Sequence, residues 1–202
     1  MSNPAIRDGR PEDGPAAGHL IREAGDRILD ALTASRDRTE TVSALTELWR
    51  RRGNRFSHQH ARVYEEEGQP LGLALDYPFV EIARLDSGTV RSLFELIGFR
   101  FFFAMLKKPL LAWGLLSSRE AEPGDWYLCV LAADPRFRGR GIGTALLEDT
   151  EARARGSGAR ALSLIVAEDN SSARRLYQRF GFRDRGRVRI DGFSSFQMVK
   201  EI

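Results

Sequence analysis

Apolar residues in the first quarter of the chain recur at the spacing of an amphipathic helix. They are Ala16, Leu20, Ile21, Ala24, Ile28, Leu32, Val42, Leu45 and Leu48. Residues three or four positions apart share one face of a helix, so this pattern predicts a helical first quarter. A short extended segment over Ala5 to Arg7 precedes it, and the turn Arg52-Gly53-Asn54 ends it.

The pattern then changes to that of a β-hairpin. Two stretches of extended type, residues 61–64 and 71–75, flank a polar segment that contains Gly68. Glycine readily adopts the positive φ angles of hairpin turns, so we predict two antiparallel strands joined near Gly68.

An aromatic pattern with helical spacing runs from Val90 to about Leu106. It gathers five phenylalanines, which are Phe94, Phe99, Phe101, Phe102 and Phe103. The longest apolar stretch, residues 93–116, overlaps it but is interrupted at Glu95, Arg100, Lys107, Lys108 and Pro109. A membrane span needs about 20 residues with few charges. We therefore expect an inserted helical segment over about residues 88–118 that is buried or forms a lid.

The second half of the chain alternates strands and helices. The predicted elements are a central strand over residues 126–132, a helix from Gly141 to Gly156 or Gly158, a strand over residues 161–167, a helix from its cap at Asn170 or Ser171 to Phe180, and two terminal strands over residues 185–190 and 194–199. Residues 120–125 are expected to form a loop, and Asp191-Gly192 a turn between the last two strands.

Composition is typical of a globular protein. At 202 residues, with 42% hydrophobic and 29% charged residues, we expect one domain over residues 1–202. The single cysteine, Cys129, excludes an internal disulfide and favours a reducing compartment, so we expect a cytoplasmic location without a secretory signal or membrane span. His19, His58 and His60 lack a metal-ligand constellation, and no metal is expected.

The net charge of +3 does not by itself indicate nucleic-acid binding. Arginines do cluster in the last third, at positions 136, 138, 140, 174, 175, 179, 183, 185, 187 and 189. A solvated face is the simpler explanation of such a cluster, and an anionic ligand is the alternative. We expect no nucleic-acid partner.

The glycine-rich turn from Asp134 to Thr144, between a strand and a helix, is the most informative motif. Glycines let the backbone approach a ligand, and a helix N-terminus directs N–H groups toward it, which suits a pyrophosphate. A P-loop is excluded because no lysine follows Gly143. A Rossmann turn is the weaker alternative, because Glu168-Asp169 mimics the ribose-binding acid but too little chain follows for a dinucleotide fold.

The same turn carries a resemblance to a known family. Arg138, Gly141 and Gly143 match the signature of the GNAT (Gcn5-related N-acetyltransferase) superfamily, which is Arg or Gln, two residues, Gly, one residue, and Gly or Ala. Residues 131–135 resemble the end of that family's fourth strand, and residues 170–182 resemble its Asn-to-Gly-Phe helix. The resemblance implies an α/β (α+β) fold, with a mixed, mostly antiparallel central sheet flanked by helices, a CoA-binding core over about residues 126–182 and a helical insert before the central strand.

The resemblance also implies acetyl-CoA as co-substrate and a set of residues that hold it. Backbone groups of Leu131 and Ala133 would pair with the pantetheine arm. The pyrophosphate would be bound by N–H groups of Arg138, Gly139, Arg140, Gly141, Ile142, Gly143 and Thr144. Asn170 would contact the arm or order a water, or would only cap a helix. Tyr177 matches the family's general acid, and its alternative role is that of a core aromatic.

The expected function is therefore an N-acetyltransferase, in which an amine attacks acetyl-CoA directly in a ternary complex. The sequence does not identify the general base, because residues 126–132 carry no carboxylate. We expect a water chain that ends at Glu65, Glu66, Glu67 or Asp76. A covalent route through Cys129 is less favoured, because a lone cysteine in an apolar strand is usually a core residue.

The acceptor, a small-molecule or peptide amine, is not identified by the sequence. The segment Phe99 to Phe103 is expected to line or cover the acceptor side, or to form a homodimer contact. The alternative function is a non-catalytic acyl-CoA sensor or protein-interaction module with the same fold. A basic nucleic-acid binder is the third hypothesis.

Overall fold

The computed structural model describes residues 4–35, 37–107, 120–190 and 193–202. The strands are β1 (Ala5–Asp8), β2 (Ala61–Glu66), β3 (Gln69–Pro78), β4 (Asp125–Ala133), β5 (Ala161–Ala167), β6 (Arg183–Ile190) and β7 (Phe193–Glu201). The α-helices are α1 (Gly14–Leu32), α2 (Arg38–Arg50), α3 (Ile82–Ile97), α4 (Phe99–Lys107), α6 (Ile142–Gly156) and α7 (Ser171–Phe180). The helical first quarter, the hairpin and the alternating second half are thus confirmed.

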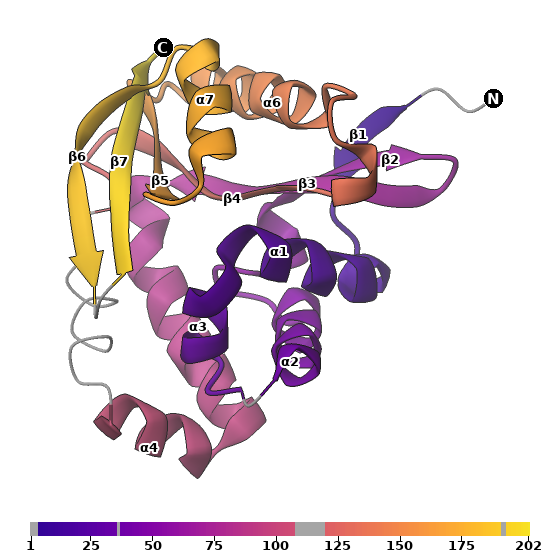
Figure 1. The fold of residues 1–202 in the computed structure, drawn as a ribbon, viewed down its shortest axis with the longest axis vertical. Coiled ribbons are helices and arrows are strands. Elements are labelled where there is room, and N and C mark those ends of the chain that lie inside the picture. Colours follow the sequence, from indigo (N-terminus) through magenta and orange to yellow (C-terminus); the bar gives the residue numbers. More distant parts are fainter. Residues whose placement is uncertain (1–3, 36, 108–119, 191–192) are drawn as a thin grey trace.

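One seven-stranded sheet, in the order β1-β2-β3-β4-β5-β7-β6, runs through the molecule (Figure 1). All neighbouring strands are antiparallel except β4 and β5, which are parallel. β4 lies in the middle of this order, as its continuous apolar run predicts. The expected mixed, mostly antiparallel sheet flanked by helices is confirmed.

Helices cover both faces of the sheet, with α1, α2 and α3 on one face and α6 and α7 on the other (Figure 1). Leu45, Leu48 and Trp49 of α2 are fully buried in the core on the first face. Leu146 and Leu147 of α6 are fully buried in the core on the opposite face. Burial of each such side chain contributes about 1.5–3 kcal/mol, so both helix layers are anchored to the sheet.

The described part of the helical segment expected over about residues 88–118 consists of two helices. α3 begins at Ile82, and Gly98, with a φ of 54°, separates it from α4. A positive φ is tolerated by glycine, which explains why the chain turns there instead of continuing as one helix. The rest of the expected segment, residues 108–119, and the expected turn at Asp191-Gly192 lie outside the described residues.

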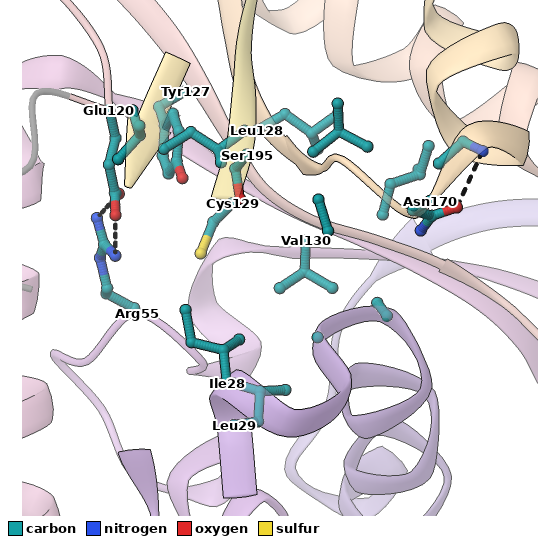
Figure 2. A pocket seen from close by; sticks show the side chains of 18 of the residues that line it. Ile28, Leu29, Arg55, Glu120, Tyr127, Leu128, Cys129, Val130, Asn170 and Ser195 are labelled. Atoms are coloured by element: carbon teal, nitrogen blue, oxygen red, sulfur yellow. Dashed lines mark hydrogen bonds and ion pairs between the residues drawn. The ribbon is translucent and has the colours of Figure 1, made fainter. Parts of the chain in front are cut away.

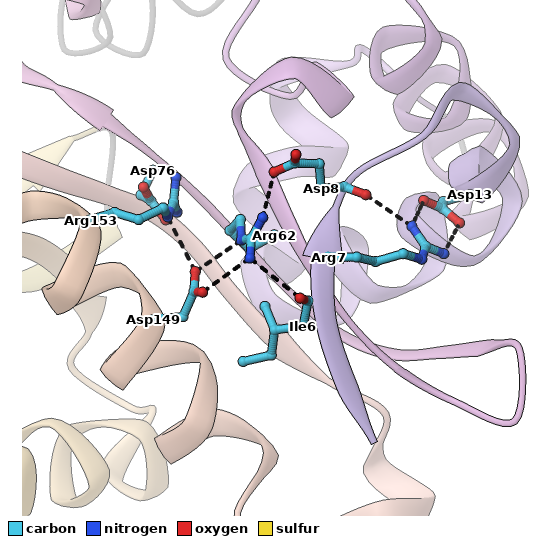
Figure 3. Close-up of polar contacts among 8 residues, drawn as sticks. All are labelled: Ile6, Arg7, Asp8, Asp13, Arg62, Asp76, Asp149 and Arg153. Carbon is cyan, nitrogen blue, oxygen red and sulfur yellow. Dashed lines mark hydrogen bonds and ion pairs between the residues drawn. The ribbon is translucent and has the colours of Figure 1, made fainter. Parts of the chain in front are cut away.

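A polar network fastens α6 to the strands (Figure 3). Arg62 of β2 donates to the Asp149 carboxylate of α6 over 3.0 and 3.2 Å. Asp76 of β3 is completely buried and accepts hydrogen bonds from Trp126, Thr150 and Arg153. Because every oxygen of the buried Asp76 carboxylate has a donor, this network fixes α6 against β2 to β4.

Candidate functional site

The two parallel strands at the centre of the sheet separate after a few residues. β4 and β5 pair from Asp125 with Ala161 to Leu128 with Leu164, and no further pairs follow. On its other edge β4 stays paired with β3 up to Ala133, with one extra residue, Cys129, between the partners of Leu75 and Asp76. Such a bulge bends a strand. β4 therefore diverges from β5 and leaves an edge, residues 129–133, that faces no strand.

This open edge offers backbone hydrogen-bonding groups. The Asp134 N–H donates to the Leu71 carbonyl on the β3 side, over 2.8 Å. Successive residues of a strand direct their N–H groups to alternate edges, so the N–H groups of Leu131 and Ala133 are directed toward the gap between β4 and β5. These are the two residues predicted to pair with an extended ligand arm.

A cavity of about 240 Å³ occupies the gap (Figure 2). α1 contributes one wall, with Ala24, Gly25, Ile28, Leu29 and Leu32. The strands contribute Tyr127 to Leu131, Ile165 to Ala167, Val188 and Ser195, while α7 and its cap contribute Asn170, Ala173 and Tyr177. Arg55, Phe56 and Glu120 complete the lining. The cavity is thus mainly apolar, with a few polar groups, as is usual for small-molecule sites.

The glycine-rich turn follows β4 and opens into α6. Gly139 and Gly141 have φ angles of 79° and 80°, and a Cβ added at either would meet no atom within 4 Å. Glycine is therefore required there by the backbone conformation, and the space beside the turn is open. Gly141, the N-cap of α6, offers no side-chain acceptor to the first N–H groups of the helix. This is the arrangement that binds phosphate groups.

The arginines of the turn differ in their contacts. Arg138 is exposed, whereas the Arg140 guanidinium is paired with Glu66 of the hairpin at 2.8 Å. The Arg140 guanidinium also lies 5.4 Å from the Phe137 ring centroid. Arg138 is therefore the turn arginine better able to reach an anion, while Arg140 holds the hairpin beside the turn.

Two predicted residues of α7 line the cavity. The Asn170 side-chain oxygen accepts a hydrogen bond of 3.1 Å from the Ala173 N–H, so Asn170 caps α7, and its side chain also borders the cavity. Tyr177 is buried, and this burial raises the pKa of its phenol above the ordinary value. The hydroxyl therefore remains protonated at neutral pH, as a proton donor must.

Cys129 lies at the bulge and lines the cavity. Burial, with Arg55 acting in the opposite direction, raises the pKa of its thiol to about 11. The thiolate is the nucleophilic form of cysteine, so this environment disfavours a covalent route.

The carboxylates predicted as ends of a water chain lie away from the cavity. Glu65 is paired with Arg7, Glu66 with Arg140, and Asp76 with Arg153. None of these three carboxylates borders the cavity, and neither does Glu67. The one carboxylate among the described lining residues is Glu120, which the sequence pattern assigned only to a loop. Its partner Arg55 was also missed, because neither residue belongs to a motif.

The aromatic residues of α4 differ in their burial. Phe101 is buried in the core beneath α1 and α2, whereas Phe99, Phe102 and Phe103 are exposed. These side chains do not line this cavity, and the expectation that the segment covers the acceptor side or forms a homodimer contact stays a prediction.

The arrangement of a splayed strand pair, a cavity between the strands and a glycine turn agrees with a comparison of families. The model of the acetyltransferase (GNAT) family matches residues 26–182, more than half of the chain. The chain belongs to the GNAT family. The match includes α3 and α4 as well as the turn and α7.

Similar proteins agree with membership of the GNAT family. A solved acetyltransferase structure is 29% identical, with a TM-score of 0.69 over 98% of this chain and 99% of that chain. An N-acetyltransferase from Staphylococcus aureus Mu50 has a TM-score of 0.78 over 97% of this chain and 100% of that chain; at 22% identity it shows the fold alone. The uncharacterized N-acetyltransferase MJ1207 of Methanocaldococcus jannaschii is 41% identical over 69 residues, which span 34% of this chain and only 29% of that protein.

In the described part of the chain, no group of three or more His, Cys, Asp and Glu residues could hold a metal ion. His58 Nδ1 lies 2.8 Å from the Trp49 carbonyl oxygen, and His60 packs edge-on against Tyr77. None of the described helices is long and apolar enough to span a membrane.

Proposed function

We propose that this GNAT protein transfers an acetyl group from acetyl-CoA to the amine of an acceptor within a ternary complex. The observation that carries the proposal is the unpaired edge of β4 over residues 129–133, which borders a cavity and leads into the glycine turn. An extended arm with amide groups can pair with such an edge as an added strand. The family to which the chain belongs supports acetyl-CoA as the donor.

The residues at hand fit that donor. The backbone groups of Leu131 and Ala133 would pair with the pantetheine arm, beside Asn170. The N–H groups from Arg138 to Thr144 would bind the pyrophosphate, aided by the positive end of α6. Arg138 would add a charge-assisted contact to a phosphate, since a guanidinium suits that geometry.

The chain's own groups would act on the transfer as follows. The acceptor amine, in its neutral form, attacks the thioester carbonyl carbon, while a backbone N–H of the open β4 edge stabilises the developing oxyanion. Tyr177 donates its proton to the departing sulfur as the carbon–sulfur bond breaks. The nitrogen gives up its extra proton to solvent, and the phenolate regains one from water. A protonated Cys129 favours this direct route over a covalent one.

The test combines binding and turnover. Isothermal titration with CoA should give measurable heat, and acetyl-CoA with a panel of amines should release free CoA in an acceptor-dependent manner. Absence of CoA binding at millimolar concentration would refute the proposal. Binding without transfer to any amine of the panel would instead favour the alternative function, a non-catalytic acyl-CoA sensor.

A further inference from the structure

Asp76 of β3 lies at the point where β4 leaves β5. Its partner in the β3–β4 ladder is Leu128, which is also the last residue of β4 that pairs with β5. The extra residue of the bulge, Cys129, follows directly. Val130 is buried in the core on the α1 side and Cys129 packs against the same core, although consecutive residues of a regular strand face opposite sides. The bulge thus shifts the alternation of β4 by one residue at the start of its open edge.

This shift determines which backbone groups of β4 face the gap. In a strand without the extra residue, Leu131 and Ala133 would take the opposite place in the alternation, and their N–H groups would be directed toward β3. The pantetheine arm needs these N–H groups on the side of the gap. The place of the bulge is therefore a condition for the proposed donor site.

The Asp76 carboxylate joins this point of the sheet to α6. One of its oxygens accepts a hydrogen bond of 2.6 Å from Trp126 Nε1 of β4. The other accepts one of 3.0 Å from Thr150 Oγ1 and one from the Arg153 guanidinium, both of α6. Figure 3 shows Arg153 beside Asp76. Because the carboxylate is completely buried and hydrogen bonds are directional, these contacts hold β3, β4 and α6 in one arrangement.

The helix transmits this arrangement to the glycine turn. Thr150 and Arg153 lie eight and eleven residues after Ile142, the first residue of α6, which is roughly 12–17 Å along the helix axis. The apolar contacts of Leu146 and Leu147 with the sheet have no preferred direction, so they alone would permit the helix to slide or rotate. The bonds to Asp76 oppose such a movement. They therefore also fix the helix N-terminus relative to the open edge of β4.

We propose that Asp76 is a positioning residue, whose carboxylate holds the open edge of β4 and the N-terminus of α6 in one relation so that a single CoA molecule can contact both. This inference rests on the proposed function, which takes CoA as the donor. The pantetheine arm and the pyrophosphate belong to one molecule, so the strength of the second contact depends on where the first contact places it. A changed relation between the two parts would weaken CoA binding without damage to either part.

Three probes separate the two contacts from the link between them. ADP carries the pyrophosphate, pantetheine carries the arm, and CoA carries both. Asp76→Asn keeps an oxygen for Trp126 but can turn its amide N–H groups toward Thr150 and Arg153, so it breaks the link to α6. We expect the CoA affinity of this variant, measured by titration, to fall roughly tenfold or more, while the affinities for ADP and pantetheine stay within about twofold of the parental values.

Two further variants test the contacts of Asp76 one at a time. Thr150→Val removes one donor of α6 with little change in shape, and Trp126→Phe removes the donor of β4. Both should weaken CoA more than either fragment, and they serve if Asp76→Asn fails to fold.

The matched control is Glu151→Gln, on the same helix. Glu151 is 15% exposed and pairs at 2.6 Å with both Arg155 and Lys200, neither of which belongs to β3 or β4. This variant also loses a partly buried carboxylate with cationic partners, but it leaves the contacts of Asp76 in place. It should therefore retain the parental affinity for all three probes.

The outcomes separate this inference from the proposed function. The expected binding pattern without transfer to any amine would refute the acetyl transfer but support the role of Asp76. Three outcomes would overturn that role and leave the acetyl transfer standing: CoA affinity unchanged in the folded variants, a fragment weakened as much as CoA, or no binding of either fragment by the parental protein. Absence of CoA binding by the parental protein would overturn both.

Discussion

At the scale of single residues, the hydroxyl of Tyr177 is the group on which the proposed chemistry depends most. Tyr177→Phe keeps the ring, which packs edge-on against Phe182 at 5.7 Å between centroids, and removes only the proton donor. We expect the transfer rate to fall on the order of a hundredfold while CoA affinity stays the same. Tyr64→Phe, on β2 and outside the cavity, is the matched control and should retain the parental rate.

The pKa of Tyr177 also leads to a prediction for the transfer rate at alkaline pH. Because burial raises the pKa of Tyr177, its proton is retained at a pH where an exposed tyrosine, with a pKa near 10, begins to lose it. The parental rate should therefore show no descending limb from this group up to about pH 9. A rate for Tyr177→Phe equal to that of the parent would mean that Tyr177 only packs and that solvent protonates the sulfur.

At the scale of elements, the turn before α6 can be tested with a closely matched pair of glycines. Gly141 and Gly158 have φ angles of 80° and 78°, and an added Cβ meets no atom within 4 Å at either. Alanine at either position should cost about 1–2 kcal/mol of stability, because a side chain is strained at these angles. Only Gly141→Ala should also weaken CoA binding, as measured by titration, because only the turn at Gly141 belongs to the proposed pyrophosphate site. Equal CoA affinity in both variants would mark Gly141 as a structural glycine alone.

The α4 helix leads to a different prediction. Phe102 and Phe103 are 54% and 55% exposed, and their rings contact each other edge-on, so the two side chains form one apolar surface. We propose that this surface contributes to a homodimer, so serine at both positions should lower the molar mass seen by light scattering without changing CoA affinity. Phe101→Ser is the contrast, since Phe101 is buried and its loss should cost about 3–5 kcal/mol of stability. An unchanged molar mass for the double variant would refute the dimer contact.

At the scale of the whole molecule, an ion pair between β1 and the start of α1 links stability to pH. Burial acts to raise the pKa of Asp13, but hydrogen bonds from Arg7 and from the Arg10 N–H outweigh it, so the pKa is lowered. A lowered pKa means that the carboxylate stabilises the fold above its unfolded value of about 4 and that this stability is lost as the pH falls through the folded value.

The matching measurement is urea denaturation at pH 7 and pH 3. Asp13→Asn should lose about 1–3 kcal/mol at pH 7, where Arg7 holds the carboxylate through two hydrogen bonds of 2.8 Å, and less at pH 3. Asp8→Asn is the control, because that side chain is 89% exposed, and it should change little at either pH. An equal loss at both pH values for Asp13→Asn would show that the pair does not account for the pH dependence.

The sequence predicted the order of elements well because local signals mark their ends. Gly141, Asn170 and Gly181 bound α6 and α7 in the structure as they do in the pattern. The ion pair at one end of the cavity could not be predicted in the same way. Arg55 and Glu120 are 65 positions apart, and only the tertiary fold brings the segment after α2 and the segment before β4 together. A long-range ion pair leaves no periodic signal, and neither does the direction in which exposed and buried phenylalanines of α4 point.

The divergence of β4 from β5 leaves the two halves of the sheet joined over a short stretch. Between β1–β4 and β5–β7 the sheet is joined by only four residue pairs, from Asp125 with Ala161 to Leu128 with Leu164. The β4–β5 ladder is thus short. Amide protons of residues 129–133 that point into the gap between β4 and β5 have no strand to protect them from exchange with solvent. A pantetheine arm would form hydrogen bonds along the open edge of β4. CoA should therefore slow hydrogen–deuterium exchange at the Leu131 and Ala133 amides far more than in the β2–β3 hairpin. Bound CoA would then link β4 and β5 where the two strands do not pair, so the donor would take the place of a missing strand.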